Sequence, residues 1–370
     1  MAWFIGLMSG TSLDGVDAVL AEADGEGRLR SRAHVHRPFA AALHDKLMAL
    51  NRSGPDELHR AALAANALVD VYARAVADLL ALSGLPAAQV LALGAHGQTV
   101  RHRPQEFDGC GYTLQLMNGA LLAERCGIDV ICDFRSRDVA AGGQGAPLVP
   151  AFHAACFAQA GRPVAVLNLG GIANLSLLGP DGDLQGFDCG PGNVLMDLWC
   201  RQHRGQPYDD GGRWAAQGQV DATLLAAWRS EPFFARRPPK STGRDLFDAA
   251  WLAQPLAGTA LTPVDVMATL TELTACTVVD ALRREAPQST ALLVCGGGAS
   301  NAHLMSRLAA LVGPSVQVSS TADAGVPPDQ VEALAFAWLA WAHLARRPGN
   351  VPAVTGASGG RLLGALYPAG

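Results

Sequence analysis

A short turn near the start of the chain concentrates groups that could bind a phosphate. It runs Gly10-Thr11-Ser12-Leu13-Asp14-Gly15-Val16-Asp17. Glycine has no Cβ and accepts positive φ, so backbone amides in such a turn can approach a phosphate, and Thr11 and Ser12 add hydroxyl donors. Asp14 and Asp17 could hold a hydrated Mg²⁺, which needs only one or two carboxylates beside phosphate oxygens. The turn therefore predicts a phosphate-binding element with two candidate metal ligands that act through water.

Two further glycine turns follow apolar segments of the sequence. They are Gly170-Gly171 and Gly296-Gly297-Gly298. A single turn of this kind is most simply an ordinary hairpin, because glycine is a common turn residue. Three such turns, one of them crowded with hydroxyls and carboxylates, favour a nucleotide site instead.

Two better-known nucleotide motifs do not fit the sequence. The first turn has the glycine spacing of a Walker A loop, but Val16 and Asp17 stand where that motif requires lysine and serine or threonine. A P-loop is therefore excluded. A GxGxxG fingerprint would begin at Gly296, but Asn301 occupies its third glycine position, which disfavours a dehydrogenase. The remaining hypothesis is a nucleotide site built from two hairpins and one strand–turn–helix.

Asp188 is the candidate catalytic carboxylate. It lies in Gly186-Phe187-Asp188-Cys189-Gly190-Pro191-Gly192-Asn193, which we expect to be a rigid loop ahead of a helix. A carboxylate held there could face a ligand and direct a proton during phosphoryl transfer. The alternative is an aspartate that caps the following helix. The residues by themselves indicate a phosphotransferase and leave its acceptor open.

The composition suggests a globular protein of two domains. The chain has 370 residues, 49% of them hydrophobic and 16% charged, with a formal net charge of −5. A single core stops growing at ~250–300 residues, so we expect two domains. The negative charge argues against a nucleic-acid partner. Eight cysteines without CxxC or zinc-type spacing are typical of reduced thiols. Because neither a signal peptide nor a membrane-spanning segment is recognisable, we expect a cytoplasmic protein with no membrane partner.

Strands and helices alternate along the sequence, which predicts an α/β fold with mixed sheets. The predicted strands are 3–8, 16–23, 90–94, 129–133, 163–168, 172–178 and 291–295. The predicted helices are 61–82, 120–126, 149–160, 265–283 and 301–311, with a last long helix after Pro327-Pro328 that reaches residue 345. The strand–glycine turn–strand pattern of residues 3–23 recurs at 163–178, which indicates an internal duplication.

The three glycine segments together resemble a known superfamily. SGTSLDGVD, NLGGIANLS and CGGGASN are similar to the first phosphate, second phosphate and adenosine segments of the actin, sugar kinase and heat-shock ATPase superfamily. More narrowly, the chain resembles the anhydro-N-acetylmuramic acid kinase family. The stretches that carry this resemblance are residues 6–17, 96–102, 133–138, 186–193, 239–244 and 325–333.

The resemblance implies an α/β fold of two actin-like (ribonuclease H-like) domains. Each would have a mixed five-stranded sheet, with a nucleotide cleft between the domains. We expect the first domain at residues 1–140, with 350–370 as a segment that could complete it, and the second at 141–349. The three glycine segments would then bind ATP, with Mg²⁺ as the second cofactor. A homodimer is also implied.

The resemblance further implies a reaction. Asp188 would deprotonate a water that attacks the anomeric carbon of 1,6-anhydro-N-acetylmuramate, and the released O6 would take the γ-phosphate of ATP. The products would be N-acetylmuramate 6-phosphate and ADP, in the recycling of cell-wall murein. The partners of the chain would be this amino sugar and ATP.

Several polar residues are candidate substrate contacts. Thr99 and His96 follow a predicted strand end, where ligands of α/β proteins tend to bind, although a polar turn would also explain them. Glu332 corresponds to an acid near the substrate in the resembling family, and a capping-box-like helix start with Asp329 is the alternative. Lys240, in a loop rich in proline, serine and threonine, could contact nucleotide or substrate or be a solvated lysine.

Two arginines would suit an anionic group of the implied sugar. Arg135 and Arg137 could bind the lactyl carboxylate of a muramic acid, because an arginine fork matches a carboxylate. Salt bridges to Asp133 or Asp138 explain them equally well. A different class of function also stays open, namely an ATP-driven actin-like or chaperone-like ATPase without a sugar substrate. A separate peptide-binding region has no obvious room in 370 residues.

Overall fold

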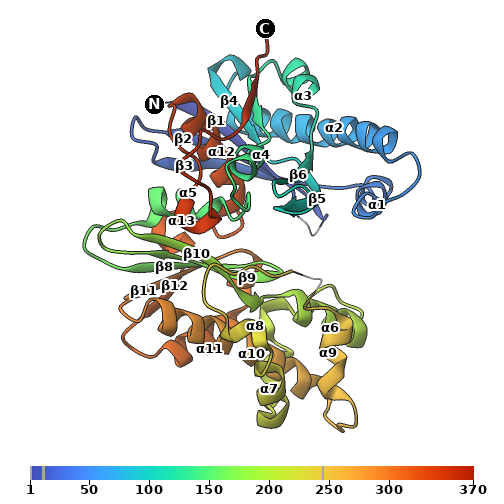
Figure 1. The fold of residues 1–370 in the computed structure, drawn as a ribbon, viewed down its shortest axis with the longest axis vertical. Coiled ribbons are helices and arrows are strands. Elements are labelled where there is room, and N and C mark those ends of the chain that lie inside the picture. Colours follow the sequence, from blue (N-terminus) through green and yellow to red (C-terminus); the bar gives the residue numbers. More distant parts are fainter. Residues whose placement is uncertain (1, 11–12, 244–245) are drawn as a thin grey trace. The chain divides into compact units, whose positions relative to one another are not determined.

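The computed structural model describes residues 2–10, 13–243 and 246–370. The chain forms two compact units, shown in Figure 1. Unit 1 comprises Met1–Cys156 and Gln330–Gly370, and unit 2 comprises Phe157–Asp329.

Unit 1 is built on a six-stranded mixed sheet in the order β13-β7-β4-β1-β2-β3. Its strands are β1 (Ala2–Met8), β2 (Gly15–Ala23), β3 (Leu29–Pro38), β4 (Val90–Ala95), β7 (Val130–Cys132) and β13 (Ala365–Tyr367), with a separate hairpin of β5 (Gln98–Pro104) and β6 (Gly111–Leu116). Its helices are α1 (Ala41–Ala49), α2 (Glu57–Ser83), α3 (Gly119–Cys126), α4 (Ser136–Ala140), α5 (Val149–Phe157), which ends at the boundary, α12 (Val331–Leu344) and α13 (Pro352–Thr355). The predicted five-stranded sheet is thus extended by the short strand β13.

Unit 2 is built on a five-stranded mixed sheet in the order β10-β9-β8-β11-β12. Its strands are β8 (Val164–Leu169), β9 (Ile172–Leu178), β10 (Leu184–Pro191), β11 (Ala291–Cys295) and β12 (Gln317–Ser320). Its helices are α6 (Val194–Arg204), α7 (Ala222–Arg229), α8 (Pro232–Ala235), α9 (Ala249–Ala253), α10 (Pro263–Glu285) and α11 (Ala302–Val312). Nearly every residue of α10 from 266 to 282 is buried, so this helix forms the centre of the unit 2 core.

The predicted duplication is present in the topology. In unit 1, β1, β2 and β3 pair antiparallel in succession, whereas β4 and β7 continue the sheet in parallel. In unit 2, β8, β9 and β10 pair antiparallel in the same way, and β11 and β12 continue in parallel. Each unit therefore repeats one strand order, and each opens with a glycine-tipped hairpin.

The helix α12 lies in unit 1, whereas the expected second domain, 141–349, would have included it. The difference arises from close packing of α12 on β1 and β4. A Cβ on Gly6 would overlap the carbonyl oxygen of Ala333, and one on Gly94 would overlap that of Phe336. The opposite face of the sheet packs on α2, through Leu68, Tyr72 and Leu79. The unit boundaries therefore fall at 156/157 and 329/330, not at 140/141 and 349/350.

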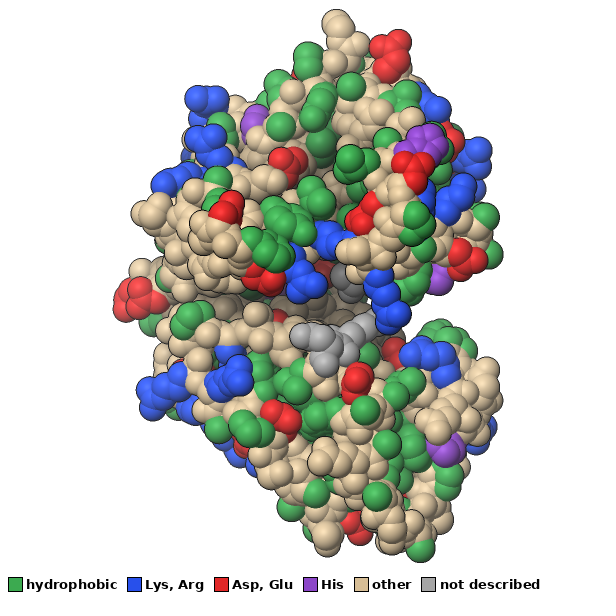
Figure 2. Space-filling model, turned by 45° about the vertical axis from the view of Figure 1, so that its right-hand side comes forward, with side chains coloured by type: hydrophobic (Ala, Val, Ile, Leu, Met, Phe, Trp, Pro, Cys, Tyr) green, Lys and Arg blue, Asp and Glu red, His purple; other side chains and the backbone are tan. Residues whose placement is uncertain are grey.

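Charged and hydrophobic side chains are interspersed on one face of the molecule. The face in Figure 2 carries acidic and basic side chains on both units, among hydrophobic and neutral groups. Within the described part of the chain, no helix combines the length and apolar character needed to cross a bilayer. Five cysteines are buried, and Cys110 is the exposed one.

Candidate functional site

The glycine turn of unit 1 joins β1 to β2. Thr11 and Ser12 lie outside the described residues, so their hydroxyl contacts stay predictions. Leu13 has a φ of 58°, and its amide donates to the carbonyl of Gly10 at 3.3 Å. A bulky residue in this region is strained, and such strain concentrates in loops shaped for ligands. Burial of the Leu13 side chain, which is 3% exposed, holds the turn in this conformation.

The two candidate metal ligands have different surroundings. Asp14 is exposed at the turn. Asp17 lies on β2, and its Oδ1 is 3.1 Å from Nε2 of His34 and 3.0 Å from Nδ1 of His36. Both histidines are on the neighbouring strand β3, where His36 is the direct partner of Asp17. The carboxylate of Asp17 is therefore engaged by this histidine pair.

Beyond the end of β4, the buried side chain of His96 pairs with the half-buried side chain of Arg135. Arg135 donates from Nε and Nη2 to Nε2 of His96, at 3.2 and 2.9 Å, and from Nη1 to the carbonyl of Gly145 at 2.8 Å. Nδ1 of His96 is 3.1 Å from the carbonyl of Ser9. Since Nε2 accepts from a guanidinium and Nδ1 faces a carbonyl, the imidazole is neutral and protonated on Nδ1. Burial lowers the pKa of His96 to about 3, and the charge of Arg135 adds to this effect.

In this geometry His96 supports the guanidinium of Arg135. His96 is only 5% exposed, and it joins the end of β1 to Arg135. Burial lowers the pKa of Arg135 to about 10, while the carboxylates of Glu332 and Asp138 raise it. The guanidinium directs its hydrogen bonds to His96 and Gly145, not to Asp133 or Asp138.

The carboxylates proposed as salt-bridge partners are occupied by other groups. Asp133 accepts from the hydroxyl of Ser136 at 2.6 Å. Asp138 is fully buried and accepts from the amide of Gly145 at 2.7 Å, from Asn350 at 2.6 Å and from the hydroxyl of Thr355 at 2.7 Å. Through Asn350 and Thr355, Asp138 therefore fixes the segment that follows α12 to the rest of unit 1.

The remaining candidates of unit 1 differ in exposure. Arg137 is exposed; its carbonyl accepts from the amide of Ala141 at 3.2 Å. Glu332 is in the first turn of α12, where its carboxylate raises the pKa of Arg135. The N-cap of α12 is Gln330, whose side chain makes no cap hydrogen bond and accepts from Ser31 at 2.6 Å.

Thr99 lies on β5, and sequence reasoning missed its neighbour Gln98. Oγ1 of Thr99 accepts from Gln115 at 3.2 Å. Gln98 is 1% exposed, and its Nε2 donates to the carbonyl of Gly10 at 3.0 Å. Its Oε1 is buried and finds no hydrogen-bond donor within the described chain. Gln98 therefore supports the first glycine turn, and only the packing of β5 against that turn reveals this contact.

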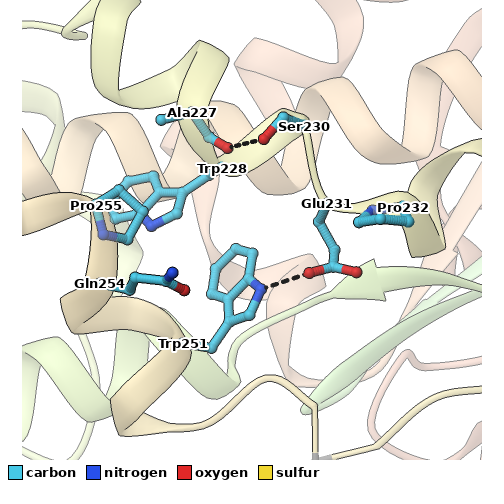
Figure 3. Close-up of a pocket in the computed structure, with 8 residues that line it drawn as sticks. All are labelled: Ala227, Trp228, Ser230, Glu231, Pro232, Trp251, Gln254 and Pro255. Carbon is cyan, nitrogen blue, oxygen red and sulfur yellow. Dashed lines mark hydrogen bonds between the residues drawn. The ribbon is translucent and has the colours of Figure 1, made fainter.

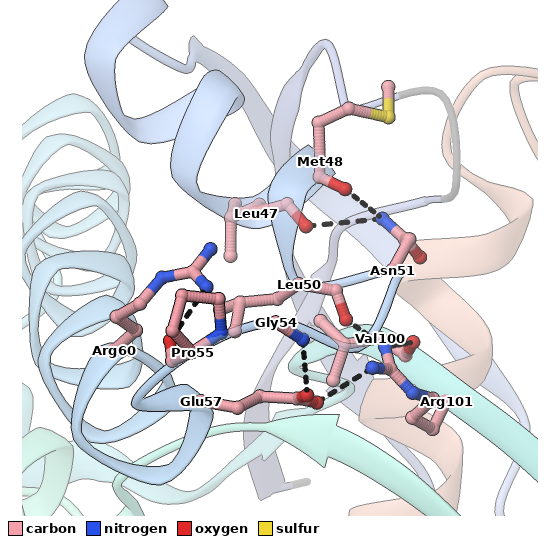
Figure 4. A network of polar contacts seen from close by, with 10 residues as sticks. All are labelled: Leu47, Met48, Leu50, Asn51, Gly54, Pro55, Glu57, Arg60, Val100 and Arg101. Atoms are coloured by element: carbon pink, nitrogen blue, oxygen red, sulfur yellow. Dashed lines mark hydrogen bonds and ion pairs between the residues drawn. The ribbon is translucent and has the colours of Figure 1, made fainter.

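Arg101, also on β5, makes contacts that stabilise the fold. It donates to the carbonyls of Leu50 and Val100, the latter at 3.0 Å, and to Oε1 of Glu57 at 2.7 Å (Figure 4). Glu57 also accepts from the amide of Gly54 at 3.3 Å. Arg101 thus holds the connection between α1 and α2.

The second glycine turn joins β8 to β9 and supports the start of α6. The carbonyl of Gly170 accepts from the amide of Asn193 at 2.8 Å, and that of Gly171 accepts from Gly192 at 2.9 Å and Val194 at 3.1 Å. The Asn193 side chain donates to the carbonyl of Leu169 at 2.9 Å. A Cβ on Gly170 would meet a single described atom, at 3.7 Å, so a ligand could approach this turn closely.

The third glycine turn joins β11 to α11. Gly296 has a φ of 78°, and a Cβ there would lie 2.4 Å from Oδ1 of Asn168 and 2.9 Å from Leu169, so only glycine fits. Gly297 faces open space. Asn301 is the N-cap of α11 and accepts from the amide of Leu304 at 3.0 Å. The residue that breaks the GxGxxG pattern is therefore a helix cap.

Asp188 lies on a strand, so the prediction of a loop at Gly186–Asn193 was wrong for the residues up to Pro191. β10 runs through Pro191, and Asp188 is the direct partner of Asn174 on β9. The register shifts between Asp188 and Gly190, as in a β-bulge, and such bulges often re-aim a side chain beside an active site. Asp188 does not cap α6, whose N-cap is Asn193.

The carboxylate of Asp188 is shielded by a loop that lies far from it in sequence. Its Oδ2 accepts from the amide of Thr242 at 2.9 Å, and its own amide donates to the carbonyl of Lys240 at 3.2 Å. Burial raises the pKa of Asp188 to about 6, against the opposing effects of the Thr242 hydrogen bond and the charge of Lys240. A carboxylate with this pKa is mostly ionised at neutral pH and still a competent base.

The structure groups the predicted residues within each unit. Unit 1 brings the Gly10 turn together with His96, Arg135 and Glu332. Unit 2 joins the Gly170-Gly171 turn to the end of β10, which carries Asp188, and places Gly296 against Asn168 at the end of β8. The nucleotide cleft stays a prediction.

The fold and the site define a class. Each unit has the strand order of an actin-like, ribonuclease H-like domain, and each carries a glycine hairpin at its first strand pair. The chain therefore has the two-domain α/β fold of the actin-like ATPases and sugar kinases. A solved ROK family glucokinase from Streptomyces griseus, in complex with glucose and AMPPNP, is similar at 14% identity and a TM-score of 0.40, covering 91% of this chain and 98% of that one. That likeness is too distant to bear on function.

The sequence comparisons are more specific. The family described as anhydro-N-acetylmuramic acid kinase matches residues 2–369. A protein of that name from Variovorax paradoxus is 61% identical, with 99% of each chain covered, and one from Bordetella petrii is 61% identical, with 99% of this chain and 96% of that one covered. The chain belongs to the anhydro-N-acetylmuramic acid kinase family. This membership does not favour the alternative of an ATPase without a sugar substrate.

Proposed function

We propose that the chain is an ATP-dependent kinase that opens the 1,6-anhydro ring of 1,6-anhydro-N-acetylmuramate with water and phosphorylates O6. The products are N-acetylmuramate 6-phosphate and ADP, in the recycling of cell-wall murein. Family membership over residues 2–369 supports the substrate. The observation that carries the mechanism is the partly buried carboxylate of Asp188, whose pKa is raised to about 6.

Asp188 is the general base of this proposal. It takes a proton from a water whose oxygen bonds to the anomeric carbon, while the bond between that carbon and O6 breaks. The electron pair of that bond stays on O6, which then bonds to the γ-phosphorus of ATP as ADP leaves. Asp188 afterwards releases its proton to solvent. Proton transfer by a positioned carboxylate contributes roughly 10²–10⁴-fold to rate.

The other candidate residues have binding roles in the proposal. Gly170, Gly171 and Gly297 are accessible backbone positions that suit phosphate or nucleotide contacts, as does the turn from Gly10 to Asp17. Arg135 is the best-supported candidate for the lactyl carboxylate, because His96 and Gly145 fix its guanidinium. Thr99, Arg137 and Glu332 stay candidate substrate contacts.

Mg²⁺ would be held mainly by Asp14. Hydrated Mg²⁺ needs few protein carboxylates, and Asp14 is exposed in the glycine turn. Asp17 fits less well, because His34 and His36 already engage its Oδ1. Within the described residues, no cluster of three or more His, Cys, Asp or Glu side chains could hold a metal. When bound, Mg²⁺ would neutralise phosphate charge. A homodimer and a cytoplasmic location are further parts of the proposal.

The substrate claim is tested by measuring ADP release with 1,6-anhydro-N-acetylmuramate, N-acetylmuramate and glucose. We expect turnover with the anhydro sugar to exceed the other two. Faster turnover on either non-anhydro sugar would refute the substrate. Sedimentation with ATP tests for filaments, which we expect to be absent.

Asp188→Asn tests the base. We expect turnover to fall by about 10²–10⁴-fold because the amide cannot take a proton, while ATP binding is unchanged. Calorimetric titration with a non-hydrolysable ATP analogue measures the binding. Turnover near that of the wild type would remove Asp188 from this role.

A further inference from the structure

Lys240 is one of two lysines in the chain, and it lies half-buried in a loop. Its Nζ is 3.3 Å from the carbonyl of Phe233 and 3.4 Å from that of Phe234. It also lies 4.6 Å from the centre of the Phe233 ring, as in a cation–π contact. The ammonium is therefore anchored on α8.

The backbone on either side of this anchor holds the catalytic carboxylate. The carbonyl of Lys240 accepts from the amide of Asp188 at 3.2 Å, and the amide of Thr242 donates to Oδ2 of Asp188 at 2.9 Å. The loop thus reaches Asp188 through two backbone groups, and one side chain fixes the loop to α8.

The helix that receives Lys240 is itself held in place. Glu231 is its N-cap and accepts from the amide of Phe233 at 3.2 Å and from the indole of Trp251 at 2.9 Å. Figure 3 shows the indole nitrogen of Trp251 directed at the carboxylate of Glu231, and both residues line a cavity of about 400 Å³. A Cβ on Gly190 would strike the ring of Phe234, so α8 also packs directly on β10. The anchor point of Lys240 is therefore rigid.

Arg284 and Glu285 are charged neighbours of Lys240. Arg284, near the end of α10, donates to the carbonyls of Phe234 and Arg236 at 3.2 and 3.4 Å and pairs with Glu285 at 2.6 Å. The positive charge of Lys240 lowers the pKa of Asp188 and that of the neighbouring thiol of Cys189. Among the residues that the structure describes, Lys240 is the charged side chain that lowers the pKa of Asp188.

We propose that Lys240 is a positioning residue, which fixes the loop 239–242 to α8 and thereby holds the carboxylate of Asp188 in its orientation. This inference rests on the proposed role of Asp188 as the base. Lys240 itself need not touch the sugar or the nucleotide. Loss of the ammonium would remove a positive charge near Asp188 and loosen the Thr242 hydrogen bond, and both changes raise the pKa of the carboxylate.

The first test is the pH dependence of kcat for Lys240→Met and Lys240→Arg. We expect the acidic limb of the profile to move upward by roughly half a unit to one unit in Lys240→Met. Turnover near pH 6 should then fall several-fold more than turnover near about pH 8.5. Lys240→Arg keeps the charge and can donate to both carbonyls, so its acidic limb should lie close to that of the wild type. Lys46→Met, at an exposed position of α1, is the matched control and should not move it.

A second measurement does not depend on catalysis. The stability difference between each protein and its Asp188→Asn partner varies with pH through the titration of Asp188. We expect this variation to move to higher pH in the Lys240→Met pair. If neither the kinetic limb nor this variation moves, the proposal is overturned. If the stability variation moves but Asp188→Asn remains active, Lys240 controls the carboxylate while the catalytic role of Asp188 fails.

Discussion

At the scale of single residues, the pKa of the candidate base Asp188 is set by burial, which raises it, and by Thr242 and Lys240, which lower it. Burial favours the neutral form of Asp188, while the Thr242 amide and the Lys240 charge favour the ionised form. The resulting pKa of about 6 lies above the ordinary value of 3.8. Between these two values the folded state holds a proton that the unfolded state has released. Stability from this group is therefore fully present below about pH 4 and is lost as pH rises through about 6.

This sign leads to a prediction for Asp188→Asn. The amide carries no charge to desolvate and its oxygen can still accept from Thr242, so the variant should be more stable than the wild type at about pH 7.5, by roughly 1–3 kcal/mol. The difference should shrink towards about pH 4. Urea unfolding at several pH values measures it. Asp181→Asn, at an exposed turn in the same unit, is the control and should show no such trend. A constant difference across pH would contradict the assignment.

At the scale of elements, the site of unit 1 depends on how closely α12 approaches the sheet. Gly6 and Gly94 leave no space for a Cβ beneath the backbone of α12. The same helix presents Glu332 to Arg135, and Phe336 to His96 at a ring separation of 4.8 Å. The glycines of β1 and β4 therefore set the position of Glu332 relative to Arg135 and that of Phe336 relative to His96.

Gly94→Ala tests this packing. The added Cβ would overlap the carbonyl oxygen of Phe336, and the displaced helix should cost about 2–3 kcal/mol of stability. Binding of the sugar should also weaken, because Glu332 moves with the helix relative to Arg135. Thermal unfolding and sugar titration measure the two effects. Gly25→Ala, where a Cβ meets nothing within 4 Å, should leave both unchanged. Equal behaviour of the two variants would show that α12 tolerates displacement.

At the scale of the whole molecule, candidate nucleotide residues occur in both units. The Gly10 turn is in unit 1, and Gly170-Gly171 and Gly296–Gly298 are in unit 2. We expect a non-hydrolysable ATP analogue to slow amide hydrogen exchange at all three turns. The mid-helix amides of α2 are the internal reference and should not respond. Protection confined to one unit would contradict the assignment of ATP contacts to both.

Much of the fold could be predicted from the sequence, since it rests on local patterns. The hairpins β1–β2 and β8–β9 and the helices α2 and α10 follow from short apolar runs, glycine tips and helical periodicity. Their repetition gave the duplicated topology. The strand β10 was missed because glycines at 186, 190 and 192 weaken its local strand signal, while pairing with β9 supplies the hydrogen bonds that make it a strand.

The glycine segments, Asp188 and the family were all readable from the chain, because residue type and spacing along the sequence carry them. The tertiary structure decided what those residues experience. It assigned α12 to unit 1, hydrogen-bonded Arg135 to His96, and brought Lys240 and Thr242 into contact with Asp188. These are contacts between residues about 40 to 330 positions apart in sequence, and only packing and burial determine such contacts and the pKa values that depend on them.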